Sequence, residues 1–134
     1  MNIMQEQVLE FHQTFGAAVR DTPGWADNAT AELRISLMEE ELFGPGELTE
    51  SIRNADLIGI ADGIADLIYV TLGTAISYGL DAEALVAEAH RSNMTKLGRD
   101  GKPVYRADGK VIKGPDFAEP DFHSVIWGAA ERTV

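Results

Sequence analysis

The middle of the chain contains the stretch Leu57-Ile-Gly-Ile-Ala-Asp-Gly-Ile-Ala-Asp-Leu-Ile-Tyr-Val70. It is long and apolar enough to form a core helix, and its two aspartates, Asp62 and Asp66, are four residues apart, which places them on one helix face. Carboxylates are rarely buried without a cation or a hydrogen-bonding partner. We therefore expect a compensating group beside this pair.

A second acidic group lies earlier in the chain, at Glu39, Glu40 and Glu41 in the segment Arg34-Ile-Ser-Leu-Met-Glu-Glu-Glu-Leu42. If this helix packs antiparallel to the aspartate helix, the carboxylates of both can meet in the bundle interior. Oxygen ligands of this kind favour Mg²⁺ or Mn²⁺, since the chain has no cysteine and no histidine pair at ligand spacing. Three adjacent glutamates are also common at a solvated helix end, so that alternative stays open for the triplet.

Composition limits the class of protein. A chain of 134 residues that is 45% hydrophobic fits a single folded domain and excludes a disordered chain. No uninterrupted apolar run reaches about 18 residues, so we expect no transmembrane helix and no membrane association. The first residues show no secretory signal, and the absence of cysteine excludes a disulfide framework. A cytoplasmic location is the expectation.

The net charge of -11 argues against binding to a nucleic acid polymer, which needs basic surface to displace counterions. A small phosphorylated ligand is not excluded by this charge. A divalent cation that bridges acidic side chains to phosphate oxygens reverses the local sign. An acidic site can therefore hold an anionic substrate.

Apolar spacing and breaker residues predict an all-α bundle of four to five helices. The expected helices cover residues 3–18, 29–42, 47–54, 55–78 and 82–96. Asn28 or Thr30 is the expected N-cap of the second helix, and Leu33, Leu37 and Leu42 form its expected inner stripe.

Breakers separate these helices from one another and from the end of the chain. The segment Phe43-Gly-Pro-Gly46 interrupts the helical pattern because Pro45 lacks a donor and its glycine neighbours loosen the backbone. After Leu97, glycine and proline become frequent, and two Asp-Gly turn signals flank Pro-Val-Tyr. We expect one domain, 1–134, with a helical core over 1–97 and a Gly/Pro-rich extension over 98–134 that is irregular or a short β-hairpin.

Five segments follow one another along nearly the whole chain: Phe11-His-Gln-Thr-Phe-Gly16, Arg34-Ile-Ser-Leu-Met-Glu-Glu-Glu41, Ile60-Ala-Asp-Gly-Ile-Ala-Asp-Leu-Ile-Tyr-Val70, His90-Arg-Ser-Asn-Met-Thr-Lys96 and Gly109-Lys-Val-Ile-Lys-Gly-Pro115. In this order they resemble the MazG-like, phosphoribosyl-ATP-pyrophosphohydrolase-like family of all-α nucleoside triphosphate pyrophosphatases. The most specific parts are Asp66-Leu-Ile-Tyr-Val70, Ser92-Asn-Met-Thr-Lys96 and Lys113-Gly-Pro115. They point to the branch with a glycine-rich C-terminal extension.

The resemblance implies a MazG-like helical bundle that forms a homodimer or homotetramer. It also implies Mg²⁺-dependent cleavage of a nucleoside triphosphate between the α- and β-phosphates, which gives a nucleoside monophosphate and pyrophosphate. House-cleaning of the nucleotide pool is the expected role at family level. A catalytically weak or inactive nucleotide-binding homologue, or a purely structural helical oligomer, is the alternative.

The family's metal motif is Glu-Glu-x-x-Glu on one helix followed by Glu-x-x-Asp on the next. Glu40 and Glu41 match the first pair, but Gly44 and Gly63 stand at two of the remaining acidic positions. A three-residue insertion in the Gly-Pro-Gly break would return Glu47 to the site, while loss of this ligand is the competing interpretation. The implied metal ligands are Glu40, Glu41, Glu47, Asp62 and Asp66, and Glu40 or Glu41 would deprotonate the attacking water.

The resemblance also implies a set of substrate-binding residues. Asn93 and Lys96 would face the nucleotide, Lys113 belongs to the matching tail, and Phe15 with Phe11 on the first helix would help to wall the base pocket. An amide can bond a base or sugar, and an ammonium can meet phosphate. Spacing alone favours roles that involve no ligand: a helix-end cap for Asn93, a solvent-exposed side chain for Lys96, and core packing for the phenylalanines.

Overall fold

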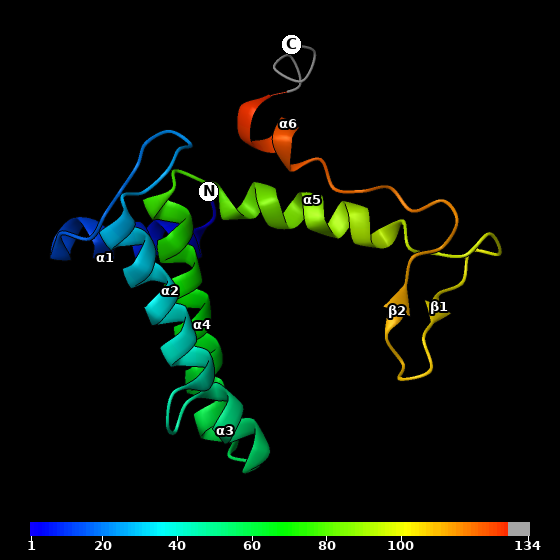
Figure 1. Cartoon of the computed structure of the whole chain (residues 1–134), viewed down its shortest axis with the longest axis horizontal. Coiled ribbons are helices and arrows are strands. Elements are labelled where there is room, and N and C mark those ends of the chain that lie inside the picture. The colour runs from blue at the N-terminus through cyan, green and yellow to red at the C-terminus, as the bar shows by residue number, and fades with distance from the viewer. Residues whose placement is uncertain (129–134) are drawn as a thin grey trace. The chain divides into compact units, whose positions relative to one another are not determined.

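The computed structural model describes residues 1–128 and is mostly helical, with a small two-stranded hairpin near its C-terminal end (Figure 1). The all-α fold class and the short hairpin are therefore confirmed. The chain divides into two compact units, Met1–Ala82 and Glu83–Val134. The expectation that they act as one domain stays a prediction.

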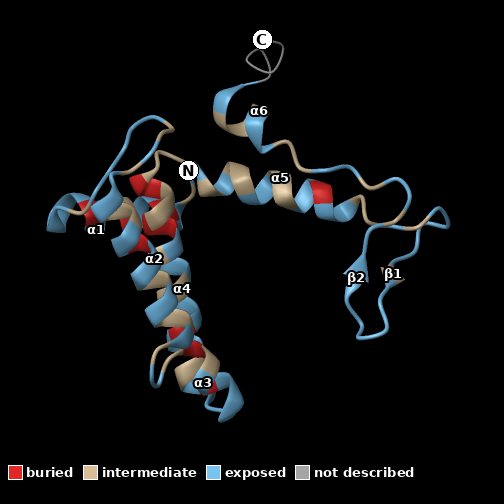
Figure 2. Ribbon diagram, viewed as in Figure 1, coloured by how far each residue is buried: buried red, intermediate tan, exposed pale blue. Residues whose placement is uncertain are grey.

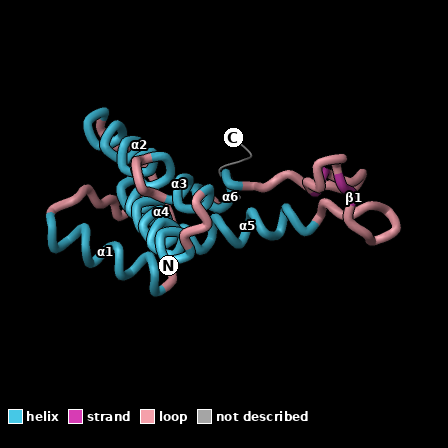
Figure 3. Tube along the Cα trace, turned by 90° about the horizontal axis from the view of Figure 1, so that it is seen from below, coloured by secondary structure: helices cyan, strands magenta, loops and turns pink. Residues whose placement is uncertain are grey.

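The first unit consists of α1 (Ile3–Phe15), α2 (Asn28–Phe43), α3 (Leu48–Arg53) and α4 (Leu57–Ser77), and α4 packs against the other three. Figure 3 shows α2 running beside α4. The predicted N-cap of the second helix is wrong by one residue, because the side chain of Asp27 accepts the hydrogen bond from the Thr30 backbone N at 2.7 Å. Asp56 caps α4 in the same way through the Gly59 N.

Few residues of this unit are fully buried (Figure 2). Many of these buried residues are polar. Val8, Leu72 and Ile76 form its apolar cluster. Gln5 is fully buried beside them, where its Nε2 donates to the Leu80 carbonyl at 2.7 Å and its Oε1 accepts from the Ala82 N at 2.8 Å. Such pairing is what makes a buried amide tolerable, and here it ties α1 to the segment that follows α4.

A buried guanidinium connects α2 to α4. Arg34 donates to the Val70 carbonyl at 2.9 Å and to the Thr74 hydroxyl at 3.3 Å. Gly73 leaves the space for this contact, because a Cβ there would lie 2.5 Å from Arg34 Nη2 and 2.7 Å from His12 Nε2. The three helices α1, α2 and α4 therefore meet at one glycine.

The apolar side chains that the sequence predicts to face the core on α1 and α2 are only partly buried. Leu33, predicted to face the core, is 54% exposed, and Phe11 and Phe15 are also exposed. Leu37 and Leu42 are half-buried. The reason is that Gln5, His12 and Arg34 occupy the interior, which leaves large apolar side chains facing outward in the single chain.

The expectation of no transmembrane helix stays a prediction. By length and composition α4 could cross a membrane, although core helices of soluble proteins meet the same criteria. Only 17% of the apolar 18-residue stretch of α4 is buried within this chain, so α4 is not the enclosed core helix that its sequence predicts. Asp62 and Asp66 would be costly in lipid, which argues against that use of the helix.

The second unit contains α5 (Ala82–Met94), β1 (Val104–Tyr105), β2 (Val111–Ile112) and α6 (Phe122–Trp127). The strands pair antiparallel, and Gly109, with φ 87°, supplies the left-handed residue of their turn. Helix α6 was not expected, because the density of glycine and proline concealed it. Its local signal is Asp121, which caps the helix by accepting from the Ser124 backbone N at 3.0 Å and the Ser124 hydroxyl at 2.8 Å.

Burial of His12 predicts a pH-dependent stability. Its Nδ1 lies 2.9 Å from the Ala18 carbonyl and must donate, and burial, opposed by this bond, lowers the pKa of the ring from 6.5. The lowered pKa means that the neutral ring stabilises the fold fully above pH 6.5, and that this stabilisation is lost as the pH falls through the lower folded value. We expect thermal unfolding between about pH 7.5 and about pH 5 to show a steeper loss of Tm for the native chain than for His12→Asn. Parallel curves would contradict this assignment.

Candidate functional site

Three carboxylates from three helices converge in the first unit. Glu41 lies near the end of α2, Glu47 caps the start of α3, and Asp66 is in the middle of α4. Each offers an oxygen, and these oxygens all lie within 4.8 Å of one another. All three residues are half-buried. We call Glu41, Glu47 and Asp66 the acidic triad.

The Gly-Pro-Gly break is the turn that delivers Glu47. The Gly44 N still bonds the Glu40 carbonyl at 2.8 Å, and the Glu47 N then bonds the Gly44 carbonyl at 3.0 Å. Gly46 takes φ 76°, where a side chain would be strained, and its N donates to Glu50 Oε2 at 2.8 Å. The chain thus reverses in three residues, and α3 begins directly after Glu47.

Gly63 then permits α3 to lie against α4. A Cβ at this position would be 2.8 Å from Leu48 Cβ and 2.9 Å from Leu48 Cα, so no larger residue fits without moving the α3 backbone. Gly63 stands where the motif that the sequence resembles has a glutamate. The close approach of Leu48 places the neighbouring Glu47 beside Asp66. The two glycines that replace motif glutamates, Gly44 and Gly63, are therefore both part of the packing that brings Glu47 to the site.

The other predicted ligands lie at the edge of this cluster. Glu40 and Asp62 are exposed and outside the acidic triad. Their charges still reach Glu41, whose pKa is raised by burial first and then by the carboxylates of Asp66, Glu47, Glu40 and Asp62. Glu39 is exposed and adds nothing to this set.

Nothing basic compensates these five carboxylates: within residues 1–128, no lysine or arginine makes an ion pair with Glu40, Glu41, Glu47, Asp62 or Asp66. Repulsion between them accounts for part of the raised pKa of Glu41. An all-oxygen donor set with this much unbalanced negative charge fits a hard divalent cation. The residues present are therefore suited to Mg²⁺ or Mn²⁺.

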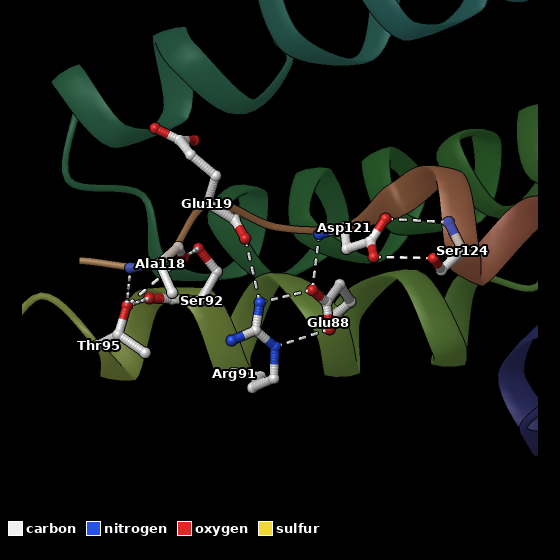
Figure 4. A network of polar contacts seen from close by, with 8 residues as sticks. All are labelled: Glu88, Arg91, Ser92, Thr95, Ala118, Glu119, Asp121 and Ser124. Atoms are coloured by element: carbon white, nitrogen blue, oxygen red, sulfur yellow. Dashed lines mark hydrogen bonds and ion pairs between the residues drawn. The ribbon is translucent and has the colours of Figure 1, made fainter. Parts of the chain in front are cut away.

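Three of the remaining predicted residues, Asn93, Lys96 and Lys113, lie in the second unit, where a polar network holds the extension on α5 (Figure 4). The Ser92 hydroxyl donates to the Ala118 carbonyl at 2.8 Å, and the Ala118 N donates to the Thr95 hydroxyl at 2.8 Å. Glu88 accepts from the Asp121 N at 2.7 Å and from Arg91, and these bonds lower its pKa to about 2.

This network separates the roles of the residues in Ser92-Asn-Met-Thr-Lys96. Ser92 and Thr95 bind the extension, whereas Asn93 and Lys96 line a pocket of about 390 Å³ together with Met94, Leu97, Pro103 and Val111. The Asn93 side chain makes no hydrogen bond within the described part of the chain, so it is not a helix-end cap. We call the cavity lined by these six residues the apolar pocket.

The Lys113-Gly-Pro115 segment is packed against the end of α5. A Cβ at Gly114 would lie 2.2 Å from the Leu97 carbonyl oxygen, and the Gly114 N donates to the Lys96 carbonyl at 3.1 Å. Glycine is required for this approach, which brings the neighbouring Lys113 close to Lys96. The Lys113 ammonium pairs with Glu119 at 3.2 Å and lies 4.6 Å from the centre of the Phe117 ring.

Phe15 belongs to neither group. Its ring lies 4.5 Å from that of Phe11, which in turn lies 5.6 Å from Tyr69 on α4. These exposed rings form an aromatic patch on the first unit. The sequence-predicted residues therefore fall into an acidic set in the first unit and an Asn93, Lys96 and Lys113 set in the second.

Comparison with protein families matches residues 8–93 to the family described as phosphoribosyl-ATP pyrophosphohydrolase. A comparison with curated proteins found no match. Among solved structures, the chain is similar to a candidate NTP pyrophosphohydrolase from Exiguobacterium sp. 255-15, at 22% identity and a TM-score of 0.50. That alignment covers 98% of this chain and 96% of the other, and it supports the fold.

The role of Gly63 can be tested with a single methyl group. We expect Gly63→Ala to push Leu48 and α3 away from α4, to lower the free energy of unfolding by about 1–3 kcal/mol, and to weaken Mn²⁺ binding measured by titration calorimetry. Gly59→Ala is the comparison variant, because the nearest atoms to its added methyl belong to the side chains of Ser51 and Asp56 and not to the α3 backbone. Native Mn²⁺ affinity in Gly63→Ala would contradict the proposed link between this contact and Glu47.

Proposed function

The chain belongs to the phosphoribosyl-ATP pyrophosphohydrolase family, and we propose on this basis that it is a metal-dependent nucleoside triphosphate pyrophosphohydrolase. It cleaves the bond between the α- and β-phosphates and releases a nucleoside monophosphate and pyrophosphate. The observation that supports this proposal is the acidic triad, because Glu47 restores the third carboxylate that the interrupted motif lacks.

Mg²⁺, or alternatively Mn²⁺, is the proposed cofactor. Glu41, Glu47 and Asp66 would hold it, and the exposed Glu40 and Asp62 stand beside them as further oxygen donors. A bound divalent ion would offset the charge of the phosphate oxygens and make a water more acidic.

Glu40 and Glu41 are the proposed catalytic residues. Glu40 lies outside the acidic triad and is open to solvent, so its carboxylate is free to orient the attacking water and accept its proton. Glu41 follows it directly in α2 and would hold the divalent ion that offsets the charge of the reacting phosphate. Both roles need the carboxylates ionised, which a nearby cation favours.

The proposed substrate-binding residues are Asn93, Lys96, Lys113 and Phe15. The amide of Asn93 is suited to an edge of the base or a sugar hydroxyl, and the two ammonium groups are suited to phosphate oxygens. Phe15 offers an exposed ring on which a base can stack.

Assembly into a homodimer or homotetramer is part of the proposal. Large apolar side chains of α4 are exposed in the single chain, among them Leu57, Ile58, Ile64 and Ile68. Soluble monomers rarely expose so much contiguous apolar surface, and a second copy would cover it. A cytoplasmic protein that removes unwanted nucleotides is the role we propose for this assembly.

The experiment is a pyrophosphate-release assay over a panel of nucleoside triphosphates with Mg²⁺ or Mn²⁺. We expect Glu47→Gln and Asp66→Asn each to reduce release by roughly 100-fold or more, because each removes a charged oxygen from the acidic triad. Glu39→Gln is the matched control, since it removes an exposed charge from the same helix outside the triad and should leave the rate unchanged.

The two alternatives give different results in the same experiment. A nucleotide-binding homologue without activity would be stabilised against thermal unfolding by nucleotide and would release no pyrophosphate. A structural oligomer would show neither response. Absence of release with every nucleotide and both metals would therefore refute the enzymatic proposal.

A further inference from the structure

We propose that the C-terminal hairpin completes a two-part nucleotide site in the second unit, in which the apolar pocket holds the base and an adjoining basic pocket, with Arg106 and Lys110, holds the polyphosphate. This rests on the proposed function in one respect only, namely that the ligand is a nucleoside polyphosphate. It adds two residues and one structural element to the substrate-binding set.

The basic pocket has a volume of about 430 Å³ and is lined by Lys96, Arg106, Lys110, Val111, Ile112 and Lys113. It gathers four of the eleven lysine and arginine residues of a chain whose net charge is -11. Because the chain as a whole is acidic, this concentration of basic side chains is a local feature of the pocket. Arg106 and Lys113 are ion-paired with Asp108 and Glu119, so the excess positive charge of the pocket rests on Lys96 and Lys110, and a polyanion can balance it.

The charges in this pocket differ in how far they are already neutralised. Arg106 is paired with Asp108 through Nε to Oδ1 at 2.9 Å and Nη2 to Oδ2 at 2.5 Å. Within residues 1–128, the ammonium groups of Lys96 and Lys110 have no carboxylate partner. These two lysines therefore provide the charge available to phosphate, and Arg106 contributes Nη1, which its ion pair does not use.

The apolar and basic pockets adjoin, because Lys96 and Val111 line both of them. On the apolar side, Met94, Leu97 and Pro103 offer surface to a flat aromatic base, and the unbonded amide of Asn93 can pair with its edge. A ligand that fills both pockets has an apolar ring joined to a polyanion. A nucleoside polyphosphate has this chemistry, whereas inorganic phosphate or a nucleoside matches only one half.

Backbone contacts hold the hairpin at the end of α5. The Gly114 N donates to the Lys96 carbonyl at 3.1 Å, and Gly114 lies directly against the Leu97 carbonyl. The bonds from Ser92 and Thr95 to Ala118 hold the segment that follows. Both pockets are thus built within the second unit.

The chain contains its own control for Lys110. Two Asp-Gly-Lys triplets form matching turns, in which the lysine N donates to the aspartate Oδ1, at 3.0 Å for Lys102 and Asp100 and at 3.2 Å for Lys110 and Asp108. Lys102 lines neither pocket, whereas Lys110 lines the basic one. Substitutions at the two lysines change the net charge and the turn equally and differ only in the pocket.

The test compares full-length Lys110→Gln and Lys102→Gln by titration calorimetry with inorganic tripolyphosphate and with α,β-imido analogues of the nucleoside triphosphates. We expect Lys110→Gln to raise the Kd of both kinds of probe about 10-fold, as expected for loss of one charged hydrogen bond, and Lys102→Gln to leave them unchanged. Equal effects of the two substitutions, or no binding of either probe to the native chain, would overturn the proposal.

Met94→Gln tests the other half of the site. Because Met94 is exposed, the fold should tolerate the change, and we expect weaker binding of the analogue with unchanged binding of tripolyphosphate. An equal loss for both probes would overturn the division into base and phosphate halves.

Turnover separates this inference from the proposed function. If the native chain releases pyrophosphate and Lys110→Gln retains its native KM, the inference fails and the function stands. If no nucleotide is cleaved but Lys110→Gln selectively loses the analogue, the function fails and the site stands.

Discussion

The contact between Gly63 and Leu48 is the constraint on which the candidate metal site depends. It brings the α3 backbone so close to α4 that a methyl group at position 63 would lie 2.9 Å from Leu48 Cα. Glu47 precedes Leu48 and Asp66 is one turn beyond Gly63, so the same contact sets the distance between these carboxylates. This packing goes together with two features of the sequence: the Gly-Pro-Gly turn before Glu47, and glycine in place of the motif glutamate at position 63.

Charge is the second constraint, and it acts against the fold unless a cation is present. Four carboxylates surround that of Glu41 without a basic partner in the described chain, and burial and their repulsion raise the pKa of Glu41. The nearest buried cation on the same helix, Arg34, is committed to the Val70 and Thr74 oxygens. A cation bound here would stabilise the folded state and serve the proposed chemistry through the same oxygens.

The second unit shows how one short motif can serve structure and binding together. Ser92 in α5 and Thr95 just beyond its end bind the backbone of the extension, while Asn93 and Lys96 line the apolar pocket. Gly114 has a matching role in the tail, since it lets Lys113 approach Lys96. Loss of the serine would be expected to disturb the pocket without touching a ligand.

Sequence alone determined the helices from α1 to α5, the hairpin and the acidic residues, because apolar periodicity, caps and Asp-Gly turns act over a few neighbouring residues, but it did not reveal α6. It also suggested that Glu47 returns after the break. Tertiary structure alone decided that Glu41, Glu47 and Asp66 converge while Glu40 and Asp62 stay exposed. It likewise buried Gln5, His12 and Arg34 in place of Leu33. These outcomes depend on close approaches at Gly63 and Gly73 between segments far apart in the chain, which local patterns do not encode.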